Sequence, residues 1–158
     1  MLRYALGLAL ALSGPAAAAT DPVFGRWLVE GGEAVVEIAP CGDQACGRLV
    51  WLQNPWAAGG GPKRDAKNPD PSARSRTLCG LRLISGLERG EDGAWEDGEI
   101  YSARDGRTYG VEITPDGPDR LNVRGYLGIS LLGGSQTWVR EDGRRGSCTT
   151  LGRSGSDR

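Results

Sequence analysis

The sequence predicts an all-β protein, with about eight antiparallel strands that close as an up-and-down barrel. Short runs in which apolar and polar residues alternate recur along the chain, as in half-buried strands. Gly and Pro separate these runs, and several Asp-Gly pairs mark hairpin turns. No long window shows the three-and-four spacing of apolar residues that an amphipathic helix requires. A meander of this kind can also close as a sandwich.

The first three strands are expected at 24–29, 33–38 and 47–52. In the second of these, Ala34, Val36 and Ile38 share one face, while its two Glu residues lie on the other. A short polar tip flanked by Cys41 and Cys46 joins the second strand to the third. The second and third strands thus form the clearest hairpin of the chain.

Five further strands are expected at 78–87, 95–101, 108–113, 120–127 and 136–140. A long irregular loop at 53–77 separates the third strand from the fourth. It contains four Pro residues and three consecutive Gly residues. Because it is longer than an ordinary connection, it is either functional or disordered.

Residues 1–19 have the features of a secretory signal peptide in the expected order. Arg3 precedes an apolar run over 4–12, and three consecutive Ala residues supply the cleavage site. The run is too short to span a bilayer, and an uncleaved anchor is the alternative. We therefore expect an exported protein, periplasmic or secreted, with no transmembrane segment after cleavage. The mature chain would be one domain at 20–151 with a flexible tail at 152–158.

The charge of the chain is nearly balanced, with 19 basic and 20 acidic residues and a formal net charge of −1. Sequence-independent binding of nucleic acid requires clustered Lys and Arg. No such cluster stands out except in the loop at 53–77. Nucleic acid is therefore not an expected partner.

The four Cys residues favour two disulfides, because an even count in an exported chain is typical of a disulfide framework. Three connectivities are possible. Cys41 and Cys46 flank a tight turn and are natural partners, which would leave Cys79 to pair with Cys148. Thiolate metal binding is the alternative, but the spacings do not match a zinc site.

The absence of His excludes the commonest general base and every Ser-His or Cys-His nucleophile arrangement. No Gly-x-Ser-x-Gly elbow is present. The carboxylates along the strands are expected on solvated outer faces rather than as acid–base pairs. We therefore expect no metal, no cofactor and no covalent catalysis.

The loop at 53–77 holds the most unusual charged stretch. Its Arg and Lys side chains could grip the carboxylate or phosphate of a ligand, and its Asp and Asn side chains could orient them. The candidate ligand-binding residues are Lys63, Asp65, Asn68, Arg74 and Arg76. The alternative is a rigid loop that covers one barrel end and is held by its own Asp–Arg pairs. The spacing of its carboxylates does not match a calcium loop.

Aromatic residues on the strands could line a hollow interior and bind the apolar part of a ligand. The candidates for this role are Trp51, Tyr109 and Tyr126. The alternative is that the aromatic side chains fill the core, since a small barrel can be packed solid.

Two local patterns resemble the calycins, the lipocalin-like barrels. Gly25-x-Trp27 opens the first strand, and Thr137-Trp138-x-Arg140 closes the last. The resemblance implies that Trp27 packs at the closed barrel end beneath Arg140. A cation stacked on an indole contributes about 0.5–2 kcal/mol.

Motifs spread over nearly all of residues 24–140 resemble the bacterial envelope family called domain of unknown function 2147. They are Gly25-Arg26-Trp27, Cys46-Gly47-Arg48-Leu49-Val50-Trp51, Asp65-x-x-Asn68-Pro69-Asp70-Pro71, Leu78-x-Gly80, Trp95-x-x-Gly98-x-Ile100-Tyr101, Asp105-Gly106-x-Thr108-Tyr109, Leu121-x-Val123-Arg124-Gly125-Tyr126 and Gln136-Thr137-Trp138-x-Arg140. The resemblance implies the fold and an envelope location, but it implies no activity.

Three functions are consistent with these observations. The first is non-catalytic binding of a small amphiphilic or hydrophobic ligand, with the apolar tail inside the barrel and an anionic head near Lys63, Arg74 and Arg76. The second is an envelope structural or protein-interaction module with a filled barrel. The third is a hydrolase-like enzyme that uses Asp65 with Arg residues.

Overall fold

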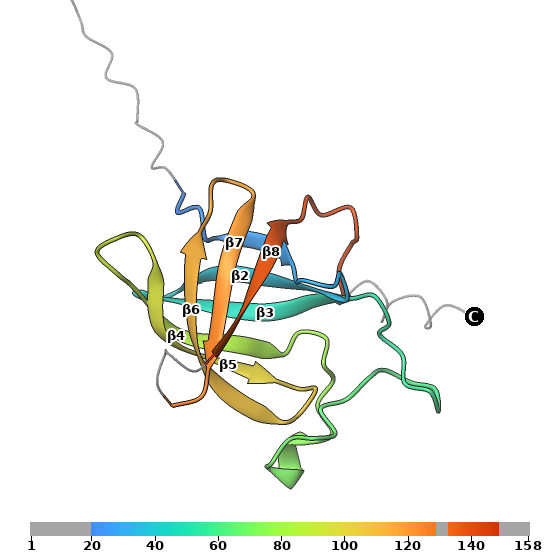
Figure 1. The fold of residues 1–158 in the computed structure, drawn as a ribbon. Helices are drawn as coiled ribbons and strands as arrows, with labels where there is room; N and C mark the ends of the chain where they lie inside the picture. Colours follow the sequence, from blue (N-terminus) through green and yellow to red (C-terminus); the bar gives the residue numbers. More distant parts are fainter. Residues whose placement is uncertain (1–19, 129–132, 149–158) are drawn as a thin grey trace, which may run out of the picture.

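The computed structural model describes residues 20–128 and 133–148, which form a closed barrel of antiparallel strands (Figure 1). The strands are β1 (Gly25–Leu28), β2 (Ala34–Cys41), β3 (Gln44–Leu52), β4 (Arg82–Arg89), β5 (Trp95–Ser102), β6 (Arg107–Pro115), β7 (Arg120–Tyr126) and β8 (Gly133–Arg140). Each strand pairs with the next and β8 pairs with β1, which confirms the predicted up-and-down barrel. The expected signal peptide and C-terminal tail lie outside the described residues.

Several expected strand boundaries are wrong: β2 ends at Cys41, and β3 and β8 begin at Gln44 and Gly133, each three residues beyond the predicted limit. The strand predicted at 78–87 begins at Arg82, because Leu81 N–H donates to Leu78 O at 3.1 Å and closes a turn there. The loop between β3 and β4 is therefore longer than predicted, and it includes a single 3-10 turn at Pro71–Ala73. No helix in the described part of the chain is long and apolar enough to cross a membrane.

The meander places its connections alternately at two ends of the barrel. The closed end holds the β2–β3, β4–β5 and β6–β7 turns, the segment before β1 and the start of the segment after β8. The open end holds the β1–β2, β5–β6 and β7–β8 connections and the long loop between β3 and β4 (Figure 1). The two ends differ in how the interior is filled.

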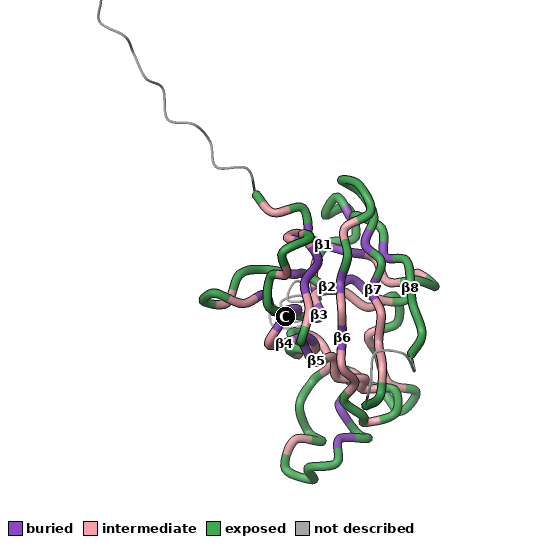
Figure 2. Tube along the Cα trace, turned by 60° about the vertical axis from the view of Figure 1, so that its left-hand side comes forward, coloured by how far each residue is buried: buried purple, intermediate pink, exposed green. Residues whose placement is uncertain are grey.

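The half of the barrel next to the closed end is packed with apolar side chains. The cluster consists of Val23, Trp27, Val36, Ile38, Ala45, Ile84, Leu87, Trp95, Val111, Ile113, Leu121, Val123 and Trp138. Buried stretches of the tube follow the strands in Figure 2, whereas the connections are largely exposed. Full burial of one large apolar side chain contributes about 1.5–3 kcal/mol, so this cluster is the main source of stability.

Two inward-facing glycines make room for large neighbours in this cluster. A β-carbon at Gly98 would lie 2.7 Å from Cγ of Leu87, and one at Gly47 would lie 2.9 Å from Cδ1 of Ile84. The Leu and Ile side chains therefore occupy the space that a β-carbon would take. A side chain at either glycine would force the packed half of the barrel to move.

Both disulfides are present in the structure, with the pairing that the sequence favours. Cys41 bonds to Cys46 across the β2–β3 turn, and Cys79 bonds to Cys148. The second bond joins the long loop to the segment after β8. It ties the two longest irregular parts of the described chain to each other.

We expect Gly98→Ala to lower the free energy of unfolding by about 1–3 kcal/mol, because the new methyl group overlaps Leu87. The control is Gly134→Ala, since a β-carbon at this inward-facing position of β8 would meet no atom within 4 Å. The control should change stability by less than about 0.5 kcal/mol. Urea unfolding of the disulfide-bonded protein measures both. Equal losses would contradict the difference in packing between the two halves.

Candidate functional site

Arg140 and Trp27 meet at the closed end. The Trp27 side chain is fully buried, and the guanidinium carbon of Arg140 lies 4.1 Å from its ring centroid. The same guanidinium donates to Pro22 O at 2.8 Å, Phe24 O at 3.1 Å and Pro118 O at 2.6 Å. Because it donates to three backbone carbonyls from two segments, Arg140 holds the barrel closed.

Gly25 lies directly beneath this guanidinium. Its φ of 129° favours glycine, and a β-carbon here would lie 2.6 Å from Nη1 of Arg140. Both the backbone conformation and the available space therefore require glycine. The structure thus brings together Gly25, Trp27 and Arg140, the three residues that the calycin resemblance connects.

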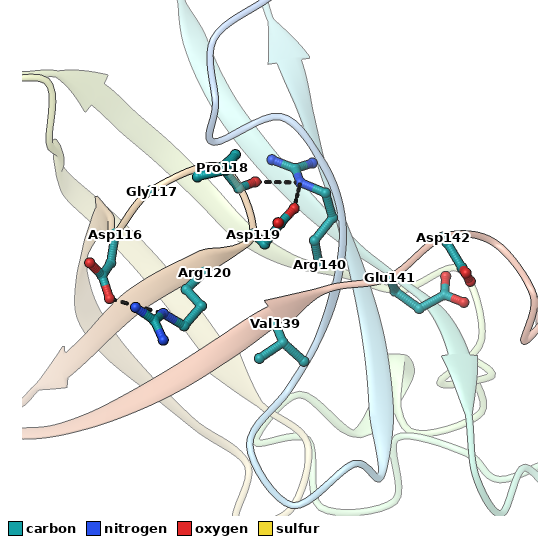
Figure 3. Close-up of a pocket in the computed structure, with 9 residues that line it drawn as sticks. All are labelled: Asp116, Gly117, Pro118, Asp119, Arg120, Val139, Arg140, Glu141 and Asp142. Carbon is teal, nitrogen blue, oxygen red and sulfur yellow. Dashed lines mark hydrogen bonds and ion pairs between the residues drawn. The ribbon is translucent and has the colours of Figure 1, made fainter.

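A surface pocket of about 700 Å³ also lies at the closed end, between the β6–β7 turn and the end of β8 (Figure 3). Its charged lining residues are Asp116, Asp119, Arg120, Arg140, Glu141 and Asp142. Asp116 pairs with Arg120 at 3.1 Å, and the carboxylate of Asp119 lies 3.7 Å from Arg140. Carboxylates outnumber guanidinium groups in this lining, so the pocket does not suit an anionic ligand.

Asp65 anchors the long loop and is fully buried. Its carboxylate accepts hydrogen bonds from Asn68 Nδ2 at 2.7 Å, Tyr101 Oη at 2.6 Å and Arg76 Nη2 at 3.2 Å. Its backbone N–H donates to Arg76 O at 2.9 Å. A carboxylate with no exposed surface and three donors cannot reach a substrate as it is placed here. This geometry favours the self-held loop over an acid–base role.

The basic residues of the loop are engaged to different degrees. Arg74 donates from Nε to Asn68 O at 2.8 Å, so it supports the same loop. Lys67 donates to Arg104 O at 2.6 Å and joins the loop to the β5–β6 turn. Lys63 makes no side-chain hydrogen bond or ion pair to any described residue. Among the three predicted cations, Lys63 is therefore the one whose ammonium group has no partner within the described residues, although the residue is half-buried.

The pKa of Tyr101 is raised because its phenol lies in a buried site next to the Asp65 carboxylate. Burial raises the pKa of Tyr101 to about 12, and the hydrogen bond to the Asp65 carboxylate adds to the effect. The ordinary pKa of tyrosine is near 10. Because the pKa is higher in the folded state, the protonated phenol stabilises the fold below about pH 10, and this contribution disappears as the pH rises towards 12.

Two of the three candidate aromatic residues lie on the outer face. Trp51 is in register with Val35 across a bulge, and the guanidinium carbon of Arg145 lies 5.2 Å from its ring centroid. Tyr126 is in register with Gly110, where a β-carbon would overlap the Tyr126 ring. Both side chains thus point away from the interior that they were predicted to line.

Tyr109 is the candidate aromatic residue that faces inward. It pairs with Ile100, and Val111 two residues later belongs to the core cluster. Its hydroxyl donates to the carboxylate of Asp105 in the β5–β6 turn, and this bond raises the pKa of Tyr109 and lowers that of Asp105. Tyr109 therefore stands at the rim of the open end, fixed by the turn beside it.

The inner face of the barrel is incompletely filled at this end. Gly125 pairs with Gly134, and both continue the inward-facing positions that Val123 and Trp138 occupy deeper in the barrel. A β-carbon at Gly134 would meet no atom within 4 Å, and Gly134 and Gln136 are exposed. Gly134 was not among the predicted site residues, and Gly125 and Gln136 were named only within the family motifs. Their small size and their alternation with Trp138 are the signals that could have identified them.

The family of the chain follows from its sequence. Residues 25–140 match the family described as an uncharacterized protein conserved in bacteria, DUF2147. The chain belongs to this DUF2147 family. The match confirms the resemblance stated from the motifs, and the matched region of this DUF2147 protein covers all eight strands. No curated protein matches the sequence.

The fold of this DUF2147 protein is similar to that of a solved lipocalin. The neighbour is protein HP1028 from Helicobacter pylori, which is described as belonging to the lipocalin family. The two share 21% sequence identity with a TM-score of 0.68, over 78% of this chain and 85% of the other. At this level of identity the comparison establishes a lipocalin-like fold.

Asp65→Ala should loosen the loop of this DUF2147 protein, because Asn68, Tyr101 and Arg76 would lose their shared acceptor. We expect unfolding to become easier by about 1–3 kcal/mol and trypsin to cleave the loop at its basic residues much faster. Asp43→Ala, which removes an exposed carboxylate at the closed end, is the control. Cleavage of Asp65→Ala at the rate of the control would show that the carboxylate does not hold the loop.

The raised pKa of Tyr101 can be measured by NMR of protein labelled with 13C at the tyrosine ζ carbons. The resonance with an apparent pKa of about 12 should be absent in Tyr101→Phe and present in Tyr109→Phe. The parent protein should also lose stability between about pH 10 and 12 more steeply than Tyr101→Phe. If Tyr101 titrates at its ordinary pKa near 10, the buried anchor at Asp65 is wrong.

Proposed function

We propose that this protein binds a small amphiphilic ligand at the open end of its barrel, without chemical conversion, in the cell envelope. The observation that carries the proposal is the change in packing along the interior. At Gly98 a β-carbon would collide with Leu87, whereas at Gly134 it would meet no atom within 4 Å. Among the described residues the interior is thus tightly packed at Gly98, whereas space remains beside Gly134.

The filled half limits the size of the apolar part of the ligand. Trp138 and Val123 close the interior below Gly134 and Gly125. A ligand would rest on this layer and contact Ile100 and Tyr109 at the side. A short acyl chain or a small ring fits such a shallow site better than a long lipid tail does.

Cations at the same end support recognition of an anionic head group. Lys63 is free to contact a ligand. Arg76 has 53% of its side chain exposed although one nitrogen bonds to Asp65, so other N–H groups of its guanidinium can still donate. Arg74 donates to Asn68 O and would act mainly through its charge. Lys63 and Arg76 are therefore the residues proposed to meet the head group.

The two disulfides support a location outside the cytoplasm. Cys41–Cys46 and Cys79–Cys148 are bonds that persist in oxidising compartments. The signal-like pattern over 1–19 points the same way. We therefore propose the periplasm or the exterior of the cell as the place where the ligand is met.

A structural or protein-interaction role is the second candidate, and the packed half of the barrel favours it. Thirteen buried side chains already form one apolar cluster, so the fold needs no ligand to complete its core. In this role the long loop, which Asp65 holds in one conformation, would present the surface to a partner.

Native mass spectrometry of the exported protein tests the first role. We expect an additional mass that is lost on denaturation in organic solvent. Gly134→Leu should abolish it, because the new side chain fills the open space. Ser135→Leu is the matched control, since the adjacent residue points outward from the same strand, and it should retain the bound mass. Bare protein in every sample would favour the structural role.

A further inference from the structure

Residues 55–63 form a small hairpin at the open end of the barrel, here called the Trp56 hairpin. Trp56 and Pro62 form an isolated antiparallel bridge, and Lys63 N–H donates to Pro55 O at 2.8 Å. Further backbone hydrogen bonds close its glycine-rich tip. The segment projects away from the barrel beyond the end of β3 (Figure 1).

Trp56 differs from the other four tryptophans of the chain. Trp27, Trp95 and Trp138 are buried and Trp51 stacks beside an arginine, whereas Trp56 is 49% exposed. An indole combines a large apolar body with one N–H donor, which suits the boundary between water and lipid. An exposed indole on a hydrogen-bonded hairpin is therefore well placed to meet a membrane surface.

The chain around this hairpin is cationic. Residues 53–82 contain six basic and two acidic residues, a net charge of +4, although the whole chain has a net charge of −1. No acidic residue occurs between positions 53 and 64. Lys63 follows the bridge directly. The exposed indole thus lies within a local excess of positive charge.

We propose that the Trp56 hairpin docks the open end of the barrel on a bilayer that contains anionic phospholipids. The indole enters the headgroup region, and Lys63 with the neighbouring cations contacts the lipid phosphates. Each Lys or Arg near an anionic surface strengthens binding roughly fivefold. A second copy of the chain is a poorer occupant, because two segments of net charge +4 would repel each other. The proposal shares Lys63 with the proposed ligand site, but it rests on Trp56 and does not require a ligand inside the barrel.

Co-sedimentation of the disulfide-bonded protein with vesicles tests the proposal. At low ionic strength we expect binding to vesicles of mixed phosphatidylglycerol and phosphatidylcholine, and little binding to phosphatidylcholine alone. Trp56→Ala should weaken binding about tenfold, and Lys63→Gln about fivefold. The tryptophan emission of the parent should shift to shorter wavelength on vesicle addition, and that shift should be absent in Trp56→Phe.

Two variants at the closed end are the matched controls. Val139→Ser removes an apolar side chain that is 42% exposed, and Arg120→Gln removes an exposed cation. Both should bind like the parent, and thermal melting verifies that every variant is folded. The proposal is overturned if anionic vesicles do not bind the parent, or if Trp56→Ala and Lys63→Gln bind like the controls. A Trp56-dependent dimer without vesicle binding would also overturn it and would assign a second copy to this surface.

Discussion

The contact between Arg140 and Trp27 determines whether this meander can close. β8 and β1 are in register only where Trp27 faces Arg140 and Leu28 faces Val139, whereas β7 and β8 pair along the whole of β8 as far as Val139. So short a seam offers few backbone hydrogen bonds. The guanidinium of Arg140 compensates, because it bonds carbonyls of both the segment before β1 and the β6–β7 turn. Hydrogen bonds from a charged donor contribute about 1.5–3 kcal/mol each.

The same short seam leaves part of the opposite end of the barrel without strand pairing between β8 and β1. β1 ends at Leu28, so among the described residues no strand pairs with the earlier part of β8 on that side. The Glu30 carboxylate accepts the Thr137 N–H at 2.8 Å and ends the seam. Beyond this point the inward-facing Gly134 and Gln136 are exposed. One constraint thus accounts for both the stable closed end and the accessible open end.

The alternation of apolar and polar residues predicted the strands well, because a strand that buries one face shows this in its own sequence. It predicted less well whether a single side chain points into the barrel or away from it. The bulge between Val35 and Val36 shifts the phase of β3, so Leu49 faces inward while Trp51 faces outward. No pattern in the sequence around this position predicts that bulge. The outward direction of Tyr126 could have been predicted, since Val123 lies an odd number of positions away. The burial of Asp65 could not have been predicted from the sequence, because Tyr101, which donates a hydrogen bond to its carboxylate, lies far along the chain.

The pocket at the closed end and the long loop at the open end also differ in charge, so the charge distribution of the molecule is asymmetric. The pocket at the closed end is lined by four carboxylates and two guanidinium groups, whereas residues 53–82 at the open end have a net charge of +4. This difference favours the approach of an anionic molecule or bilayer to residues 53–82 over its approach to the pocket at the closed end. Under the proposed function, the Arg140 contact that closes the barrel and the surface that meets a ligand lie at opposite ends, so changes in the long loop can alter recognition without weakening that contact.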